Sequence, residues 1–200
     1  MASQALRPAV FLSASTPDPR RHPRYYATSD VSAIREAIVA LATVVLPAGR
    51  LLFGGHPAVS PLIWLIAQQI GAVDRVRIYQ SEFFRSAVPP ESLAFPSIVW
   101  TPEIPGDRQG SLAVMREAML ADLPVRSGVF IGGMEGVEEE FALFRKQHAS
   151  LPAYAIASTG AAAKIIFDRN PSVPSDPLVR RALEHDVVYD ALFRGLRDVG

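Results

Sequence analysis

Hydrophobic and polar positions follow two kinds of pattern along this chain. Short apolar runs, several rich in β-branched residues, are typical of buried strands, and they occur at Pro8–Ala14, Arg50–Phe53, Val73–Tyr79, Ser97–Trp100, Ser127–Ile131 and Leu151–Ala157. Between them, apolar residues recur at helical spacing. This spacing predicts helices that begin near Ser29 or Asp30, cover Pro61–Ile70, Asp107–Leu120 and Ala161–Phe167, and start near Val137. The alternation predicts an α/β fold, a Rossmann-like doubly wound, mostly parallel sheet with helices on both faces.

The length of 200 residues favours a single domain. We expect residues 1–170 to form the Rossmann-type domain, and residues 171–200 to be a linker and C-terminal helical extension of the same domain. The predicted helix Pro61–Ile70 is apolar nearly all round, so it needs cover on two sides. Packing within the fold supplies one side, and a partner subunit would supply the other. The chain is therefore expected to form a homo-oligomer, a dimer or higher.

The most informative stretch is Phe130–Glu140, which is predicted as a strand, a glycine turn and a helix start. Gly132 and Gly133 allow backbone angles closed to other residues and let a ligand approach the backbone. The N–H groups at such a helix start favour an anion such as phosphate. We therefore predict that the residues of this turn bind a ligand: Gly132, Gly133, Met134, Glu135, Gly136 and Val137. The alternative is an ordinary strand–helix turn without a ligand.

Other candidates follow the carboxyl ends of the predicted strands, where ligands bind in open parallel sheets. They are Ser13 and Ser15 after the first strand, and Gly54, Gly55, His56 and Ser60 after the second. Ser60, before Pro61, is the expected N-cap of its helix. Ser158–Gly160 marks a third possible anion-binding helix start. The Thr16–Thr28 segment is rich in proline and arginine; it either closes over a ligand, with tyrosines that stack and arginines that pair with phosphate, or it is a solvated loop.

Two charged residues occupy positions where the helical stripes predict apolar ones. Arg116 falls in the stripe of Leu112, Met115 and Met119, and Glu140 falls in that of Val137, Phe141 and Phe144. A charge there is costly unless it is paired or reaches the edge of the helix. The two residues form either a structural ion pair or a site, with Arg116 on a ligand phosphate and Glu140 on a ribose hydroxyl or a leaving base. Glu138 and Glu139 lie off the stripe and are expected to face solvent.

Composition excludes several classes of function. The formal net charge of +0 gives no support to nucleic-acid binding. The chain has no cysteine, and its four histidines show no metal-binding spacing, so we expect no metal site and no cofactor. GxGxxG, GxxxxGK[ST] and GxSxG motifs are absent from the sequence. The N-terminus is not a signal peptide by pattern, and no apolar run reaches membrane length. The chain is expected to be cytoplasmic.

The segments Phe53-Gly54-Gly55, Met115–Met119 and Ile131–Glu140 together resemble the SLOG superfamily. This resemblance implies a Rossmann-like fold and a nucleotide-type ligand. The LOG phosphoribohydrolases within it carry PGGxGTxxE; in this chain Ile131 takes the place of the proline, one residue is extra within Met134-Glu135, Val137 replaces the threonine, and Glu140 matches the glutamate. The arginine of that family would fall at Ala118, two positions from Arg116. The chain is more similar to the nucleotide-sensing branch found near TIR domains.

Three hypotheses follow from these observations. The first is a module that binds and senses a nucleotide-derived ligand, ADP-ribose or an NAD-related molecule, at the carboxyl ends of the strands. The second is a nucleotide N-glycosidic hydrolase of the LOG type, in which Glu140 stabilises positive charge on the ribose and Arg116 holds the phosphate. The third is an interaction domain without a ligand.

Overall fold

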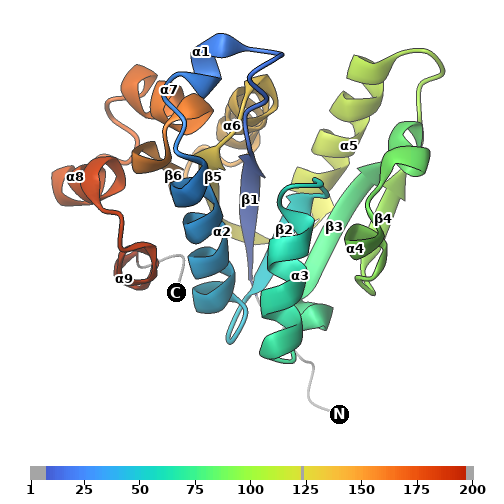
Figure 1. The fold of residues 1–200 in the computed structure, drawn as a ribbon, viewed down its shortest axis with the longest axis horizontal. Coiled ribbons are helices and arrows are strands. Elements are labelled where there is room, and N and C mark those ends of the chain that lie inside the picture. The colour runs from blue at the N-terminus through green and yellow to red at the C-terminus, as the bar shows by residue number, and fades with distance from the viewer. Residues whose placement is uncertain (1–7, 123, 197–200) are drawn as a thin grey trace.

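Six parallel strands form one sheet in the order β4-β3-β2-β1-β5-β6 in the computed structural model, which describes residues 8–122 and 124–196 (Figure 1). The strands are β1 (Ala9–Ser15), β2 (Arg50–Gly54), β3 (Val76–Ser81), β4 (Ile98–Thr101), β5 (Val125–Gly132) and β6 (Ala153–Ile156). The predicted α/β, Rossmann-like fold with a parallel sheet is confirmed.

Helices cover both faces of the sheet (Figure 1). On one face, α2 (Val31–Val45) packs against β1, β2, β5 and α3 (Ser60–Gln69). On the other face, α5 (Arg108–Asp122) packs against β2, β3 and β4, and α6 (Glu135–Gln147) packs against β1 and β5. The remaining helices are α1 (Pro23–Tyr26), α4 (Pro90–Leu93), α7 (Ala161–Arg169), α8 (Pro177–His185) and α9 (Tyr189–Gly195), with short 3-10 helices η1 (Val73–Arg75), η2 (Glu82–Ala87) and η3 (Ala157–Thr159).

The order of the strands reverses at β1. The chain builds outward from β1 to β4, and α5 then carries it back so that β5 pairs on the other side of β1. Helices α2 and α3 precede this return and lie on the face opposite α5 and α6. Ligands of open α/β sheets bind at such a reversal, outside the carboxyl ends of the strands. In this chain that edge is formed by Ser15 of β1, Gly54 of β2 and Gly132 of β5.

An aromatic cluster fixes α6 on the sheet. The rings of Phe11 and Phe144 stack at 5.8 Å between centroids, and Phe130 meets both edge-on at 5.9 and 5.8 Å. Gly128 leaves the necessary room, because a Cβ there would lie 3.0 Å from the rings of Phe130 and Phe144. The aromatic cluster therefore packs the C-terminal half of α6 against β1 and β5.

Several element boundaries differ from those predicted. Residues 73–75 form η1, and the third strand starts at Val76. Helix α6 starts at Glu135, two residues before Val137. The Thr16–Thr28 segment is not wholly irregular, because it contains α1 with Tyr25 fully buried. In the connection between β3 and β4, Phe95 is buried, with its ring centroid 5.0 Å from that of Trp64.

The C-terminal helices pack on the sheet domain. Helix α9 lies along α2, and α8 contacts β6 and η3. The Asp176 carboxylate caps α8 by accepting hydrogen bonds from the N–H groups of Leu178 and Val179. The predicted C-terminal extension, residues 171–200, ends outside the described residues. No helix in the described ranges has the length and apolar character needed to cross a membrane.

Candidate functional site

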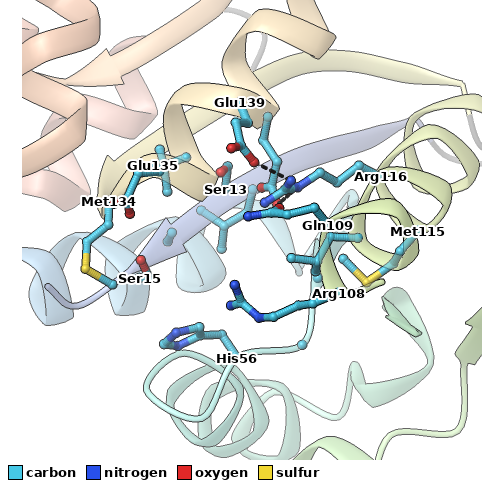
Figure 2. Close-up of a pocket in the computed structure, with 18 of the residues that line it drawn as sticks. Ser13, Ser15, His56, Arg108, Gln109, Met115, Arg116, Met134, Glu135 and Glu139 are labelled. Carbon is cyan, nitrogen blue, oxygen red and sulfur yellow. Dashed lines mark hydrogen bonds and ion pairs between the residues drawn. The ribbon is translucent and has the colours of Figure 1, made fainter. Parts of the chain in front are cut away.

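A pocket of about 360 Å³ lies at the carboxyl end of β1, where the strand order reverses (Figure 2). Its walls come from the end of β1, the loop after β2, one face of α5, the first turns of α6, and Arg21 and His22 of the segment after β1. This volume falls in the range of roughly 300–1,000 Å³ found for small-molecule sites. The pocket is rich in charged groups of both signs.

The structure brings most of the predicted site residues to this pocket. Its lining includes Ser13, Ser15, Gly54, Gly55, His56, Arg116, Met134, Glu135, Gly136, Val137 and Glu140. Gly132, Gly133 and Ser60 do not line it. Four segments distant in sequence therefore converge here, as expected for a parallel sheet.

Gly132 and Gly133 have a structural reason for being glycine. Both adopt positive φ, 55° and 85°. A Cβ on Gly132 would lie 2.4 Å from the Ile34 side chain, and one on Gly133 would lie 2.2 Å from that of Val137. The Gly132 N–H donates to the Thr159 hydroxyl at 2.9 Å. The space above these two glycines is thus filled by the protein, whereas the prediction had a ligand approach there.

Ser60 fixes a loop instead of capping its helix. The N-cap of α3 is Val59, one residue earlier than predicted. The buried Ser60 hydroxyl accepts a hydrogen bond from the His56 N–H at 3.2 Å and one from the Ser92 hydroxyl at 2.7 Å. The third predicted helix start is also occupied, because the Ala161 N–H at the start of α7 donates to the Thr28 hydroxyl at 3.1 Å.

Arg116 joins α5 to α6 through two carboxylates. Its Nε donates to Glu140 Oε1 at 3.3 Å, and its Nη1 forms a short contact with Glu139 Oε2 (Figure 2). Arg116 is 9% exposed. A Cβ on Gly136 would lie 3.1 Å from Arg116 Nη2, so the first turn of α6 passes directly over the guanidinium. The predicted neighbourhood of Arg116 and Glu140 is present, and Glu139, which is exposed as expected, is the second partner.

Burial raises the pKa of Glu140, and Arg116 opposes this rise. Ser13 is 1% exposed and lies near enough to Glu140 to lower its pKa, as Arg116 does. The Ser13 hydroxyl has no partner in hydrogen-bonding geometry among the described residues. A polar group buried without a partner carries a free-energy cost. The Ser13 hydroxyl is therefore available to a ligand in the pocket.

Glu138, also expected to face solvent, holds the segment after β1 in place. Its carboxylate accepts a hydrogen bond from the Tyr25 hydroxyl at 2.6 Å and pairs with Arg24 at 3.3 Å and Arg169 at 3.0 Å. Burial, followed by this hydrogen bond to Glu138, raises the pKa of Tyr25 to about 12. Tyr25 consequently acts as an anchor and does not stack on a ligand. His22 pairs with Glu135 at the rim of the pocket.

The pocket also carries two arginines that the sequence analysis did not name individually. Arg21 and Arg108 line the pocket, and neither forms a salt bridge with any described residue. His56 lies on the same side as Arg108, across from Glu135 and Glu139 (Figure 2). Its Nδ1 accepts from the Ala58 N–H at 3.1 Å, which leaves the proton on Nε2. Desolvation, then the charge of Arg21, lowers the pKa of His56, so the ring is neutral at pH 7.

The sequence did contain one signal for these cations. Arg21 and His22 belong to the arginine-rich Thr16–Thr28 segment, which follows β1 directly. Arg108 is the first residue of α5, at the carboxyl edge of the sheet after β4. No group of three or more His, Asp or Glu residues in the described part of the chain is arranged to hold a metal ion.

We predict that Arg116→Met destabilises the fold by about 3–5 kcal/mol, because it leaves the buried Glu140 carboxylate without a compensating charge. Glu140→Gln should cost far less, since an amide oxygen still accepts from Arg116. The double variant should be more stable than Arg116→Met alone. Urea unfolding of the four proteins checks this, and a double variant no more stable than Arg116→Met would contradict the assignment.

The raised pKa of Glu140 also predicts a pH dependence. A carboxyl with a higher pKa in the folded state favours folding when protonated, and this contribution is lost as the pH rises from about 4.5, its ordinary pKa, through its folded value. The stability of Glu140→Gln relative to the wild type should therefore increase with pH over that range and then level off. Urea unfolding at a series of pH values measures the difference. A constant or falling difference would contradict the shift.

Comparison with known proteins agrees with this architecture. The X-ray structure of TM1055, a structural genomics target, is 18% identical to this chain, with a TM-score of 0.54 over 80% of this chain and 81% of that one. At this identity the likeness shows the fold alone. No curated protein is similar enough to match. The model of the SLOG cluster3 family matches residues 24–196. With so much of its length matched, the chain belongs to the SLOG cluster3 family.

Proposed function

We propose that this protein binds a nucleotide-derived small molecule, ADP-ribose or an NAD-related ligand, in the pocket at the carboxyl end of β1. The observation that carries the proposal is the division of charge within the pocket. Arg108 lies across the pocket from Glu135 and Glu139 (Figure 2). Arg21 lines the same pocket, and neither arginine has a salt-bridge partner among the described residues. Membership of the SLOG family supports a nucleotide-related role.

Each side of the pocket suits a different part of such a ligand. Arginine presents several N–H donors that match the geometry of phosphate oxygens. The first N–H groups of α6, a helix of 13 residues, have no intrahelical acceptor and favour an anion. Carboxylates such as those of Glu139 and Glu140 accept hydrogen bonds from the hydroxyls of a ribose. A ligand with phosphate and ribose groups in sequence would satisfy both sides.

The engagement of Arg116 favours binding over turnover. Its guanidinium already donates to Glu139 and Glu140, so it is not free to hold a phosphate as the hydrolase hypothesis requires. We therefore propose a sensing role, in the manner of SLOG domains found near TIR proteins. The signal would pass through self-association, for which α3 offers Leu65 and Ile70, 53% and 40% exposed.

We predict that Arg108→Ala and Arg21→Ala each weaken ADP-ribose binding by about tenfold or more, because each removes a charge-assisted contact to phosphate. Isothermal titration calorimetry measures the affinities. Arg20→Ala is the matched control for Arg21, since Arg20 is exposed on the same segment and does not line the pocket. Arg35→Ala, on α2, serves in the same way for Arg108. Equal loss in a control and its test variant would contradict the placement.

One observation favours a second function, an N-glycosidic hydrolase. The buried carboxyl of Glu140 lies in the pocket next to the unpartnered hydroxyl of Ser13. In this reaction the bond between C1′ of the ribose and the base nitrogen breaks, water supplies the hydroxyl to C1′, and the base leaves with a proton. Ionised Glu140 would stabilise the positive charge that develops on the ribose.

If the protein is such a hydrolase, Glu140→Gln should lower turnover by 10²-fold or more, on the order of the effect of removing one stabilising group, with little change in binding. Proton NMR of AMP and ADP-ribose in the presence of the protein reports loss of the ribose anomeric signal. Turnover equal to wild type in this variant would exclude Glu140 as a catalytic residue. No turnover by the wild type would favour the sensing role.

A further inference from the structure

A second cavity lies next to the candidate site. This side compartment, of about 260 Å³, is lined by Pro57, Phe84, Val88, Pro89, Leu112 and Met115, together with parts of the loop after β2. It shares Gly55, His56, Arg108, Leu112 and Met115 with the main pocket, so the two are adjacent. Most of its own wall comes from the β3–β4 connection, in which η2 lies.

The chemistry of the side compartment differs from that of the main pocket. All the carboxylates of the combined site, Glu135, Glu139 and Glu140, line the main pocket, and the side compartment has none among its described lining residues. Its wall is instead aromatic and aliphatic, with polar groups only at Gln80, His56 and Arg108. Such a wall accepts an uncharged planar group and disfavours a phosphate or a sugar, because their polar groups would lose hydration without new partners.

Its size limits what it accepts. A volume of about 260 Å³ is below the roughly 300 Å³ at which sites for whole drug-sized ligands begin, so it suits one fragment of a larger ligand. The rest of that ligand would extend into the main pocket, past the residues that the two cavities share.

The residues that the two cavities share indicate which part of the ligand lies in each cavity. Arg108 lies at the junction, with its guanidinium carbon 5.7 Å from the centre of the Phe84 ring. Its side chain lines both the main pocket and the side compartment. The neutral His56, with its proton on Nε2, offers one hydrogen bond to a ring nitrogen. A nucleobase has an apolar face for Phe84 and an acceptor at its edge for His56.

From this geometry we infer that the side compartment is a nucleobase site, and that Phe84 and Val88 select adenine-bearing ligands over sugar phosphates. This inference rests on the proposed function and adds the orientation of the ligand. The base lies against Phe84, the phosphates lie near Arg108 and Arg21, and the distal ribose of ADP-ribose faces Glu139 and Glu140.

The test compares ADP-ribose and AMP with ribose 5-phosphate, which lacks the base, by isothermal titration calorimetry on the full chain. The wild type should bind the two adenine ligands more tightly than ribose 5-phosphate. Phe84→Ala should weaken ADP-ribose and AMP by about tenfold, the effect of losing one base–aromatic stack, and leave ribose 5-phosphate unchanged. Leu93→Ala, 53% exposed in the same connection and outside both cavities, is the control.

Three results would overturn the inference, and they can be told apart. Equal affinity of the wild type for ribose 5-phosphate and the adenine ligands would show that the base contributes nothing to binding. The side compartment would then not be a base site, but the proposed function would stand. An equal loss for all ligands in Phe84→Ala would show that Phe84 only supports Arg108. Binding of none of the three would reject the proposed function together with the base site.

A direct measurement keeps the test independent of how well Phe84→Ala folds. In the wild-type protein, nuclear Overhauser effects should connect the adenine H2 or H8 protons with the Phe84 ring and the Val88 methyl groups. Effects from adenine to residues of α6 instead would place the base in the main pocket and contradict the inference.

Discussion

The contact of Arg116 with Glu139 and Glu140 is the constraint on which the site depends. Helices α5 and α6 meet on one face of the sheet, where the strand order reverses, and this contact joins them above the end of β1. A buried ion pair is weak evidence for stability, but loss of Arg116 would leave the Glu140 carboxylate without a compensating charge. The contact also gives one wall of the pocket its negative character and leaves Arg21 and Arg108 as the cations open to a ligand.

Much of this arrangement could be predicted from periodicity. The apolar runs and stripes predicted the parallel α/β sheet. The positions of Arg116 and Glu140 within apolar stripes indicated that the two residues form an ion pair or a site. The roles of Glu138 and Glu139 could not be predicted this way, because both lie off the stripe. Their partners, Tyr25 and Arg24 for Glu138 and Arg116 for Glu139, lie on separate elements that only the tertiary fold brings together.

The glycines show a different limit of the sequence. A glycine pair between strand and helix predicts an open backbone. In the direction of a Cβ, however, the side chain of Ile34 occupies the space at Gly132 and that of Val137 the space at Gly133. A glycine required for packing and one required for a ligand have the same signature in a single sequence. Arg108 and Phe84 were not predicted to lie at the site. Arg108 is at the start of a helix and Phe84 lies in the connection between β3 and β4, where the sequence pattern does not show which way a side chain points.

The central claim is that a nucleotide-derived ligand binds at the carboxyl end of β1, between α5 and α6. The most direct measurement is a titration of ¹⁵N-labelled protein with ADP-ribose, followed by amide chemical shifts. We predict saturable shifts in Ser13–Ser15, Gly55 and His56, and in Glu135 and Gly136 at the start of α6, with none in α8 and α9. Absence of shifts, or shifts confined to α8 and α9, would contradict this claim.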